Sequence, residues 1–131
     1  MTKRINISSD VPWEDLVGYS RAVRIGNLIE VTGTVAAEGG KVVAPNDPYG
    51  QTVFILKKIE KALKEAGGCR QDVIRTRMFV TDISQWEKIG KAHGEFFQGI
   101  KPATSMIEVK GLISQDYLIE IEATAVVGDP A

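Results

Sequence analysis

The chain has 131 residues, of which 44% are hydrophobic and 25% are charged, and its formal net charge at pH 7 is −1. This composition suits one globular domain over residues 1–131, and the near-neutral charge argues against a nucleic-acid-binding surface. No apolar stretch is long enough for a membrane span, the N-terminal residues MTKRINISSD lack a secretory signal, and one cysteine with one histidine cannot form a disulfide or a zinc site.

The first part of the chain predicts strands and turns. Apolar and polar residues alternate over 3–7, 19–25 and Leu28–Val35, which is typical of half-buried strands. The dipeptide at 26–27, Gly-Asn, is a favoured two-residue hairpin turn between the second and third of these strands. We expect loops over 8–18 and 45–50, and a short edge strand over 41–44.

The strand after the hairpin turn carries a glycine among its apolar residues. Strict alternation puts Gly33 on the apolar side with Ile29 and Val31. Thr32 and Thr34 then fall on the polar side. A missing side chain on the apolar side of a strand indicates that another group approaches the backbone closely.

Two helices are predicted in the middle of the chain, with a strand over 73–81 between them. Residues 51–66 repeat apolar side chains at helical spacing, and a pair of glycines ends this helix. Ser84 and Glu87, three residues apart, form a capping-box pattern that predicts the start of the second helix, and Gly99 predicts its end. We expect Trp86 and His93 on the buried side of the second helix.

The segment 101–125 predicts two strands joined by a loop over 111–116. Pro102 opens the first strand, at a position where a missing backbone donor is tolerated. The second strand, over 118–127, alternates between an apolar row that begins with Ile119 and a polar row that contains Glu120 and Glu122. The apolar row needs a cover, and the two helices can supply it.

These elements predict an α+β fold in which two helices pack on one face of a mixed sheet of about six strands. The other face would mix charges of both signs with apolar groups. Its residues would be Glu30, Thr32, Arg75, Arg77, Phe79, Met106, Glu108, Leu118, Glu120 and Glu122. A face of this kind suits a subunit interface, so we expect a homo-oligomer.

Several segments resemble the Rid family of reactive-intermediate deaminases, also called YjgF-type proteins. They are PATSMIEV at 102–109 and LIEIEATA at 118–125, with GYSRAV at 18–23, GNLIEVTGT at 26–34 and VIRTRMFVTDISQW at 73–86. The resemblance implies a chorismate-mutase-like domain and a homotrimer with small-molecule clefts between subunits. It also implies imine or enamine hydrolysis, in which an arginine clamps the carboxylate of a 2-imino acid and a glutamate holds the attacking water.

Four residues match the family's site positions. The resemblance implies that Tyr19, Thr32 and Gly33 line the cleft. It implies that Glu120 positions the water. Each position also has a structural interpretation: Tyr19 could pack at an interface, Thr32 is an ordinary strand residue, and Glu120 could pair with an arginine on the same sheet face.

Three further site positions depart from the family pattern. Thr104 stands where the family has its clamping arginine, and Met106 and Gly90 replace a small residue and an asparagine. A cleft without that arginine loses a charge-assisted contact, so we expect weak or absent activity on the usual 2-imino acids. Arg24 or Arg21 could supply a displaced anion clamp, although the favoured interpretation of both is a solvated surface residue.

The second predicted helix carries two glycines and the chain's histidine. Gly90 and Gly94 each weaken a helix by roughly 1 kcal/mol relative to alanine, which suggests a close approach by a sheet or a ligand. His93 falls one turn after Gly90 and could reach the same cleft as a proton donor or acceptor. The alternative is a histidine that only fills space.

The function expected from these features is that of a Rid-like homotrimer that hydrolyses an imine or enamine other than the usual 2-imino acid. The alternative is a trimer that binds a small ligand without turning it over. Ribonuclease or translation-inhibitor activity, with which some relatives are labelled, has little support from a slightly acidic chain. We expect a cytoplasmic protein with no cofactor, no metal, no membrane contact and no nucleic-acid partner.

Overall fold

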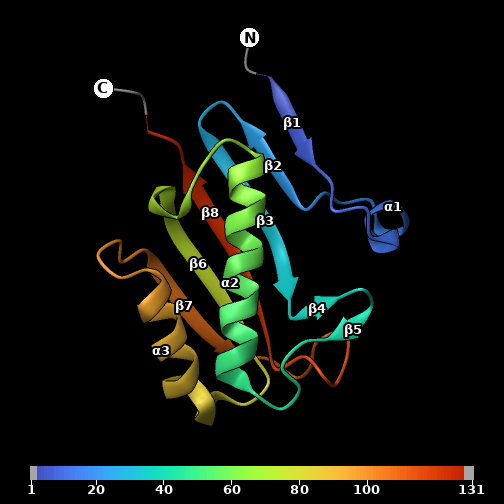
Figure 1. Cartoon of the computed structure of the whole chain (residues 1–131), viewed down its shortest axis with the longest axis vertical. Coiled ribbons are helices and arrows are strands. Elements are labelled where there is room, and N and C mark those ends of the chain that lie inside the picture. Colours follow the sequence, from blue (N-terminus) through green and yellow to red (C-terminus); the bar gives the residue numbers. More distant parts are fainter. Residues whose placement is uncertain (1–2, 129–131) are drawn as a thin grey trace.

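A computed structural model describes residues 3–128 of the chain. It contains a six-stranded sheet in the order β1-β2-β3-β8-β6-β7 and a two-stranded ribbon, β4-β5 (Figure 1). The strands are β1 (Arg4–Ile7), β2 (Ala22–Ile25), β3 (Leu28–Val35), β4 (Ala37–Glu38), β5 (Lys41–Val42), β6 (Val73–Val80), β7 (Ala103–Glu108) and β8 (Ile119–Val126). Neighbouring strands of the large sheet are antiparallel, except that β6 and β7 run parallel.

Two long helices, α2 (Pro48–Glu65) and α3 (Trp86–Phe96), lie against each other on one face of the large sheet (Figure 1). We call this face the helix face, and the uncovered one the open face. Aliphatic side chains of α2 and the central strands meet between the two layers. Fully buried examples are Ile29, Ile55, Ile59, Leu63, Ile119 and Ile121. The predicted α+β architecture, with about six strands and two helices on one face, is therefore confirmed.

Helical structure begins in two places where loops were expected. The helix α1 (Pro12–Val17) lies within 8–18, with Pro12 in its first turn and Gly18, at φ 83°, closing it in the left-handed region. The helix α2 begins at Pro48 rather than at residue 51. Asp47 accepts a hydrogen bond from the Gly50 amide, and proline is tolerated in a first turn, where its missing donor has no partner to lose.

A bulge in β3 changes which of its residues face the core. The pairing of β3 with β8 shifts between Val31 and Thr34. Thr34 is consequently buried, with 1% of its surface exposed, and Gly33 turns toward the open face. The prediction that Gly33 lies on the apolar side and Thr34 on the polar side was wrong, because the extra residue of a bulge reverses the alternation beyond it.

The start of α3 also differs from the prediction. Asp82 accepts a hydrogen bond from the Ser84 amide and caps the short 3-10 helix η2 (Ile83–Gln85), so the predicted capping box does not form. Trp86, the first residue of α3, is 56% exposed instead of buried. The first turn of α3 does not pack on the core, because the first buried residue of this helix is Ile89.

The parallel pairing of β6 with β7 determines the faces of the edge strand. Thr76 aligns with Thr104, so alternate residues of β7 from Thr104 onward share the helix face. Met106 packs against the core, and Glu108 accepts a hydrogen bond from the Ile83 amide at 3.0 Å. The expectation that Met106 and Glu108 lie on the open face was wrong, because alternation alone does not say which side of an edge strand meets the helices.

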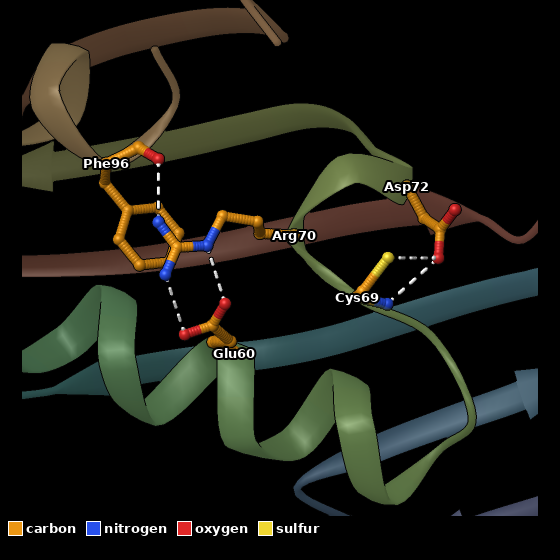
Figure 2. Close-up of polar contacts among 5 residues, drawn as sticks. All are labelled: Glu60, Cys69, Arg70, Asp72 and Phe96. Atoms are coloured by element: carbon orange, nitrogen blue, oxygen red, sulfur yellow. Dashed lines mark hydrogen bonds and ion pairs between the residues drawn. The ribbon is translucent and has the colours of Figure 1, made fainter. Parts of the chain in front are cut away.

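An arginine clamp joins the helices beside the 3-10 helix η1 (Arg70–Asp72), as Figure 2 shows. The Arg70 guanidinium donates to both oxygens of the Glu60 carboxylate, at 2.6 and 3.1 Å, and to the Phe96 carbonyl at 3.1 Å. It also lies over the Phe96 ring, 4.1 Å from the centroid. Next to it, the amide and thiol of Cys69 donate to the Asp72 carboxylate. These contacts hold α2, α3 and the start of β6 together.

Candidate functional site

The sheet separates the predicted site residues into two groups. The open-face group consists of Tyr19, Thr32, Gly33 and Glu120. The helix-face group consists of Gly90, His93, Thr104 and Met106. Because the buried layer of β8, β6 and β3 lies between them, a single chain does not bring both groups around one ligand.

A wide polar hollow of about 760 Å³ lies on the open face beside α1. Tyr19 and Thr32 line it together with Arg77 and Glu122. Arg77 Nη1 lies 3.7 Å from Glu122 Oε1, and more than a third of each of these two side chains is exposed. A loose, solvent-facing ion pair of this kind contributes little to stability, so both groups remain available to a ligand or a partner surface.

Glu120 owes its position to the glycine opposite it. A Cβ atom added to Gly33 would lie 2.5 Å from Glu120 Oε2 and 2.9 Å from its carboxyl carbon. Any side chain at position 33 would therefore displace the carboxylate. The close approach inferred from the sequence is present, and its partner is the Glu120 side chain on the open face.

Within the part of the chain that the structure describes, no cationic side chain forms an ion pair with the Glu120 carboxylate. Burial raises its pKa, the neighbouring Glu122 carboxylate raises it further, and Arg21 opposes the shift. Arg77 pairs with Glu122, and Arg75 donates to Ser105 Oγ at 2.8 Å, so neither arginine takes up the structural pairing considered for Glu120. Among residues 3–128, no side chain hydrogen-bonds this carboxylate, which leaves it able to accept a proton or hold a water.

Arg21 lies beneath the open-face group. Its side chain is buried, with 8% exposed, and Nη1 donates to Thr34 Oγ1 at 3.1 Å and to the Gly33 carbonyl at 3.4 Å. The guanidinium carbon is 5.9 Å from the centroid of the Tyr19 ring. Within the described chain its buried Nε has no hydrogen-bond partner. Arg21 thus supports the bulge that carries Gly33.

Arg24 is placed apart from both groups. It donates to the Gly26 carbonyl in the hairpin turn and to the Ala66 carbonyl at the end of α2, each at 2.9 Å. These bonds give a donor to one carbonyl group in the turn and to one at the end of the helix, where the last carbonyl groups have no partner within the helix. Its geometry is that of a structural residue, and a ligand role for it would require both bonds to break.

The helix-face group contains a chain of hydrogen bonds. His93 Nε2 lies 2.8 Å from Thr76 Oγ1, which donates to Thr104 Oγ1 at 2.7 Å. Thr76 is fully buried and His93 is 8% exposed, while Thr104 is exposed on β7. Burial lowers the pKa of His93, which favours the neutral imidazole. The residue that replaces the family's arginine is therefore linked to the histidine through one buried hydroxyl.

Sequence reasoning missed Thr76. Thr76 alternates with the buried Met78 and Val80, so it lies on the core side of β6, where it is fully buried. A threonine that alternates with Met78 and Val80 was the available signal, because a buried hydroxyl requires a hydrogen-bond partner.

The two glycines of α3 face open space. A Cβ atom added at Gly90 or at Gly94 would meet nothing within 4 Å. The close approach expected at these positions is therefore not made within the described chain. The helix presents bare backbone beside His93, on the side that also carries the exposed Trp86.

Residues 3–128 contain no cluster of three or more His, Cys, Asp or Glu side chains arranged to hold a metal ion. No helix in this part of the chain is both long and apolar enough to cross a bilayer.

Comparisons with known proteins agree with the family resemblance. A family model described as endoribonuclease L-PSP matches residues 12–127. An uncharacterised protein of Streptomyces coelicolor is 34% identical over 119 residues, which covers 91% of this chain and 89% of the relative. A RutC family protein of Pyrococcus abyssi is 32% identical over 127 residues, which covers 95% of this chain and 98% of the relative.

The fold has close counterparts among solved structures. A member of the YjgF/YER057c/UK114 family from Mycobacterium tuberculosis superimposes with a TM-score of 0.88 at 46% identity. The superposition covers 95% of this chain and all of the other. These matches confirm the Rid-type resemblance and the expected chorismate-mutase-like α+β fold.

Proposed function

The chain belongs to the endoribonuclease L-PSP family, which includes the YjgF and Rid proteins, and on that premise we propose that it is a homotrimeric imine or enamine hydrolase with clefts between subunits. The observation that carries this proposal is the separation of the two groups by the sheet. A cleft that uses both Glu120 and the Thr104–His93 side must draw them from two copies of the chain. The substrate is an imine or enamine metabolite other than a small 2-imino acid.

The exposed surface of the chain supports assembly. Neither α2 nor α3 covers the open face (Figure 1). This face carries charged side chains of both signs together with apolar ones, as in a non-obligate interface. Ile107 on this face is 48% exposed, and Trp86 is exposed beside the bare backbone of Gly90. A second copy that covers these residues would bury apolar area now in water.

The proposed reaction needs a positioned water and a proton carrier. Glu120, with its raised pKa, takes a proton from water as the oxygen adds to the imine carbon, and it returns this proton to the imine nitrogen. The adduct then collapses: its hydroxyl proton passes through Glu120 to the amine, the C=O bond forms, the C–N bond breaks and ammonia leaves, with Glu120 ionised again. Tyr19 and Thr32 line the same face and help to orient the substrate.

The first test measures assembly and turnover together. We expect a trimer by light scattering, and ammonia release from a panel of imines generated in solution. Turnover of 2-aminoacrylate should be weak, and Thr104→Arg should increase it by restoring a carboxylate clamp. A monomeric wild-type protein, or turnover equal to that of a Rid enzyme whose arginine is intact, would contradict the proposal.

A mixing experiment tests whether each cleft takes residues from two chains. Glu120→Gln disables the open-face half, and Gly90→Trp obstructs the helix-face half, where an added side chain has room. Co-assembly of the two inactive variants should recover about a quarter of wild-type turnover, because random mixing leaves that share of interfaces with both halves intact. No recovery in verified mixed oligomers would mean that each site lies within one chain.

The helix-face group also supports a second candidate, a trimer that binds a small ligand without turnover. None of its four members is a cation, and Thr104 replaces the residue that would hold a substrate carboxylate. A ligand-induced rise in melting temperature without ammonia release from any imine would favour this candidate. The family model's description names an endoribonuclease, but a net charge of −1 argues against RNA binding. We therefore expect the purified protein not to cleave RNA.

A further inference from the structure

Hydrogen bonds on the helix face link His93 to Thr104 through the Thr76 hydroxyl, which has one hydrogen. Thr76 Oγ1 lies 2.7 Å from Thr104 Oγ1 and 2.8 Å from His93 Nε2. In the arrangement in which Thr76 donates to Thr104, the contact with His93 requires the hydrogen on Nε2 of the imidazole. The imidazole also packs against the Phe97 ring at a tilt of 50°, with the ring centroids 4.7 Å apart.

The Thr104 hydroxyl, at the other end of this series of hydrogen bonds, can still donate a hydrogen bond. Thr104 accepts from Thr76, and among residues 3–128 no group accepts the hydrogen of the Thr104 hydroxyl. Thr104 is exposed on the edge strand β7. In this arrangement the hydrogen of the Thr104 hydroxyl is left for an acceptor outside the chain.

We propose that Thr76 is a positioning residue that fixes His93 and Thr104 so that the helix-face group donates one hydrogen bond to a neutral acceptor, such as an ester, amide or ketone oxygen beside the reacting carbon. The substrate class is thus a carbonyl-derived imine with a neutral substituent in place of the carboxylate. This inference rests on the proposed function, because it assigns a substrate to the same cleft.

The charge of the substituent determines why the helix-face group prefers a neutral substrate to a carboxylate. A carboxylate that leaves water needs a cation or several donors, and the helix-face group offers one hydroxyl and a neutral imidazole whose hydrogen is already used. A neutral carbonyl oxygen needs a single donor, which the Thr104 hydroxyl supplies. The group therefore discriminates against the anion without any repulsive charge.

The first measurement is the tautomer of His93 by 15N NMR, which is unambiguous because the chain has one histidine. The wild type should show the Nε2–H tautomer. Thr76→Val keeps the side-chain shape and should release the ring into a tautomer mixture, and Thr76→Ser should restore the wild-type signature. An Nδ1–H tautomer in the wild type, or no change in folded Thr76→Val, would overturn the proposal.

The second measurement compares pyruvate with methyl pyruvate, in which a neutral methyl ester replaces the carboxylate at the recognised end. Methyl pyruvate should bind more tightly to the wild type, and Thr104→Val, on the exposed strand, should weaken it roughly 3- to 10-fold while leaving pyruvate unchanged. Thr76→Val should have the same effect, with rescue by Thr76→Ser. Tighter pyruvate binding, or no binding of either probe, would overturn the inference.

The two proposals fail separately. If the protein prefers methyl pyruvate and His93 shows the expected tautomer, but no imine releases ammonia, the proposed hydrolase activity is rejected. The positioning role of Thr76 is then retained. Imine hydrolysis with a preference for the carboxylate would reject the role of Thr76 and keep the hydrolase.

Discussion

Glu120 and Gly33 form one unit although they come from different strands. The carboxylate occupies the volume that a side chain at position 33 would fill, and burial keeps its pKa above the usual range of glutamate. A half-buried carboxyl that forms no ion pair within residues 3–128 costs folding free energy, which fits the proposed catalytic role better than a stabilising one. The following substitution separates these two roles.

Glu120→Gln should lower imine turnover by about 100-fold or more, because the amide cannot accept the proton of the attacking water. It should not lower the free energy of unfolding at neutral pH. As pH rises above the usual pKa of glutamate, the unfolded carboxyl ionises before the folded one, so this group makes the wild type less stable. Urea unfolding between about pH 4 and pH 7.5 measures this decrease in the free energy of unfolding. The variant should not show the decrease.

Glu122→Gln is the matched control, since Glu122 lies in the same polar row and forms a loose ion pair with Arg77. Its turnover should stay near that of the wild type. Full activity in Glu120→Gln, or equal losses in the two variants, would contradict the assigned role of Glu120.

His93 makes stability depend on pH in the opposite direction. Because burial lowers its pKa, the unfolded imidazole takes up a proton before the folded one as the solution is acidified. The free energy of unfolding should therefore fall as pH drops from the usual pKa of histidine toward the lowered value. His93→Gln does not titrate and keeps a polar neighbour for Thr76, so its pH profile should be flatter; parallel profiles would reject the shift.

Among the elements, α3 contains two glycines that lower the stability of the helix. Gly90 and Gly94 interrupt the helix although an added Cβ atom would meet nothing at either position. Gly90→Ala and Gly94→Ala should each raise the free energy of unfolding by about 1 kcal/mol in urea titrations, through helix propensity alone. A loss of stability in either variant of a dissociated chain would mean that the glycine makes a contact within it.

The two glycines should differ in function. Gly90 is one turn from His93 and belongs to the helix-face group, whereas Gly94 is exposed farther along the helix. Gly90→Leu should reduce imine turnover or ligand binding at least several-fold by filling the cleft, while Gly94→Leu should leave both near the wild-type level. Equal effects in the two variants would remove Gly90 from the proposed cleft.

For the molecule as a whole, the open face is the surface on which the proposed assembly would depend. Ile107→Lys places a charge on β7 where an apolar side chain is 48% exposed, and it should shift the protein toward monomers in light scattering. Turnover should fall with assembly, because each cleft needs two chains. Lys57→Glu on the outer side of α2 is the control, and it should stay assembled; an active monomer of Ile107→Lys would reject the shared cleft.

Local patterns in the sequence were sufficient for the architecture. Alternation identified the main strands of the large sheet, helical spacing identified α2, and the Gly-Asn turn joined β2 to β3. These features depend on residues close together in the chain, where steric and hydrophobic preferences act directly. The same is true of the row that places Glu120 opposite the buried Ile119 and Ile121.

The arrangement of the site depended on contacts between distant segments. A bulge in β3 moved Gly33 to the open face, and the parallel register of β7 put Thr104 beside Thr76. Neither a bulge nor a register appears in the periodicity of one strand, because both arise when strands pair and the layers pack. The sequence therefore predicted which elements form, and packing across the sheet placed the candidate site residues on opposite faces.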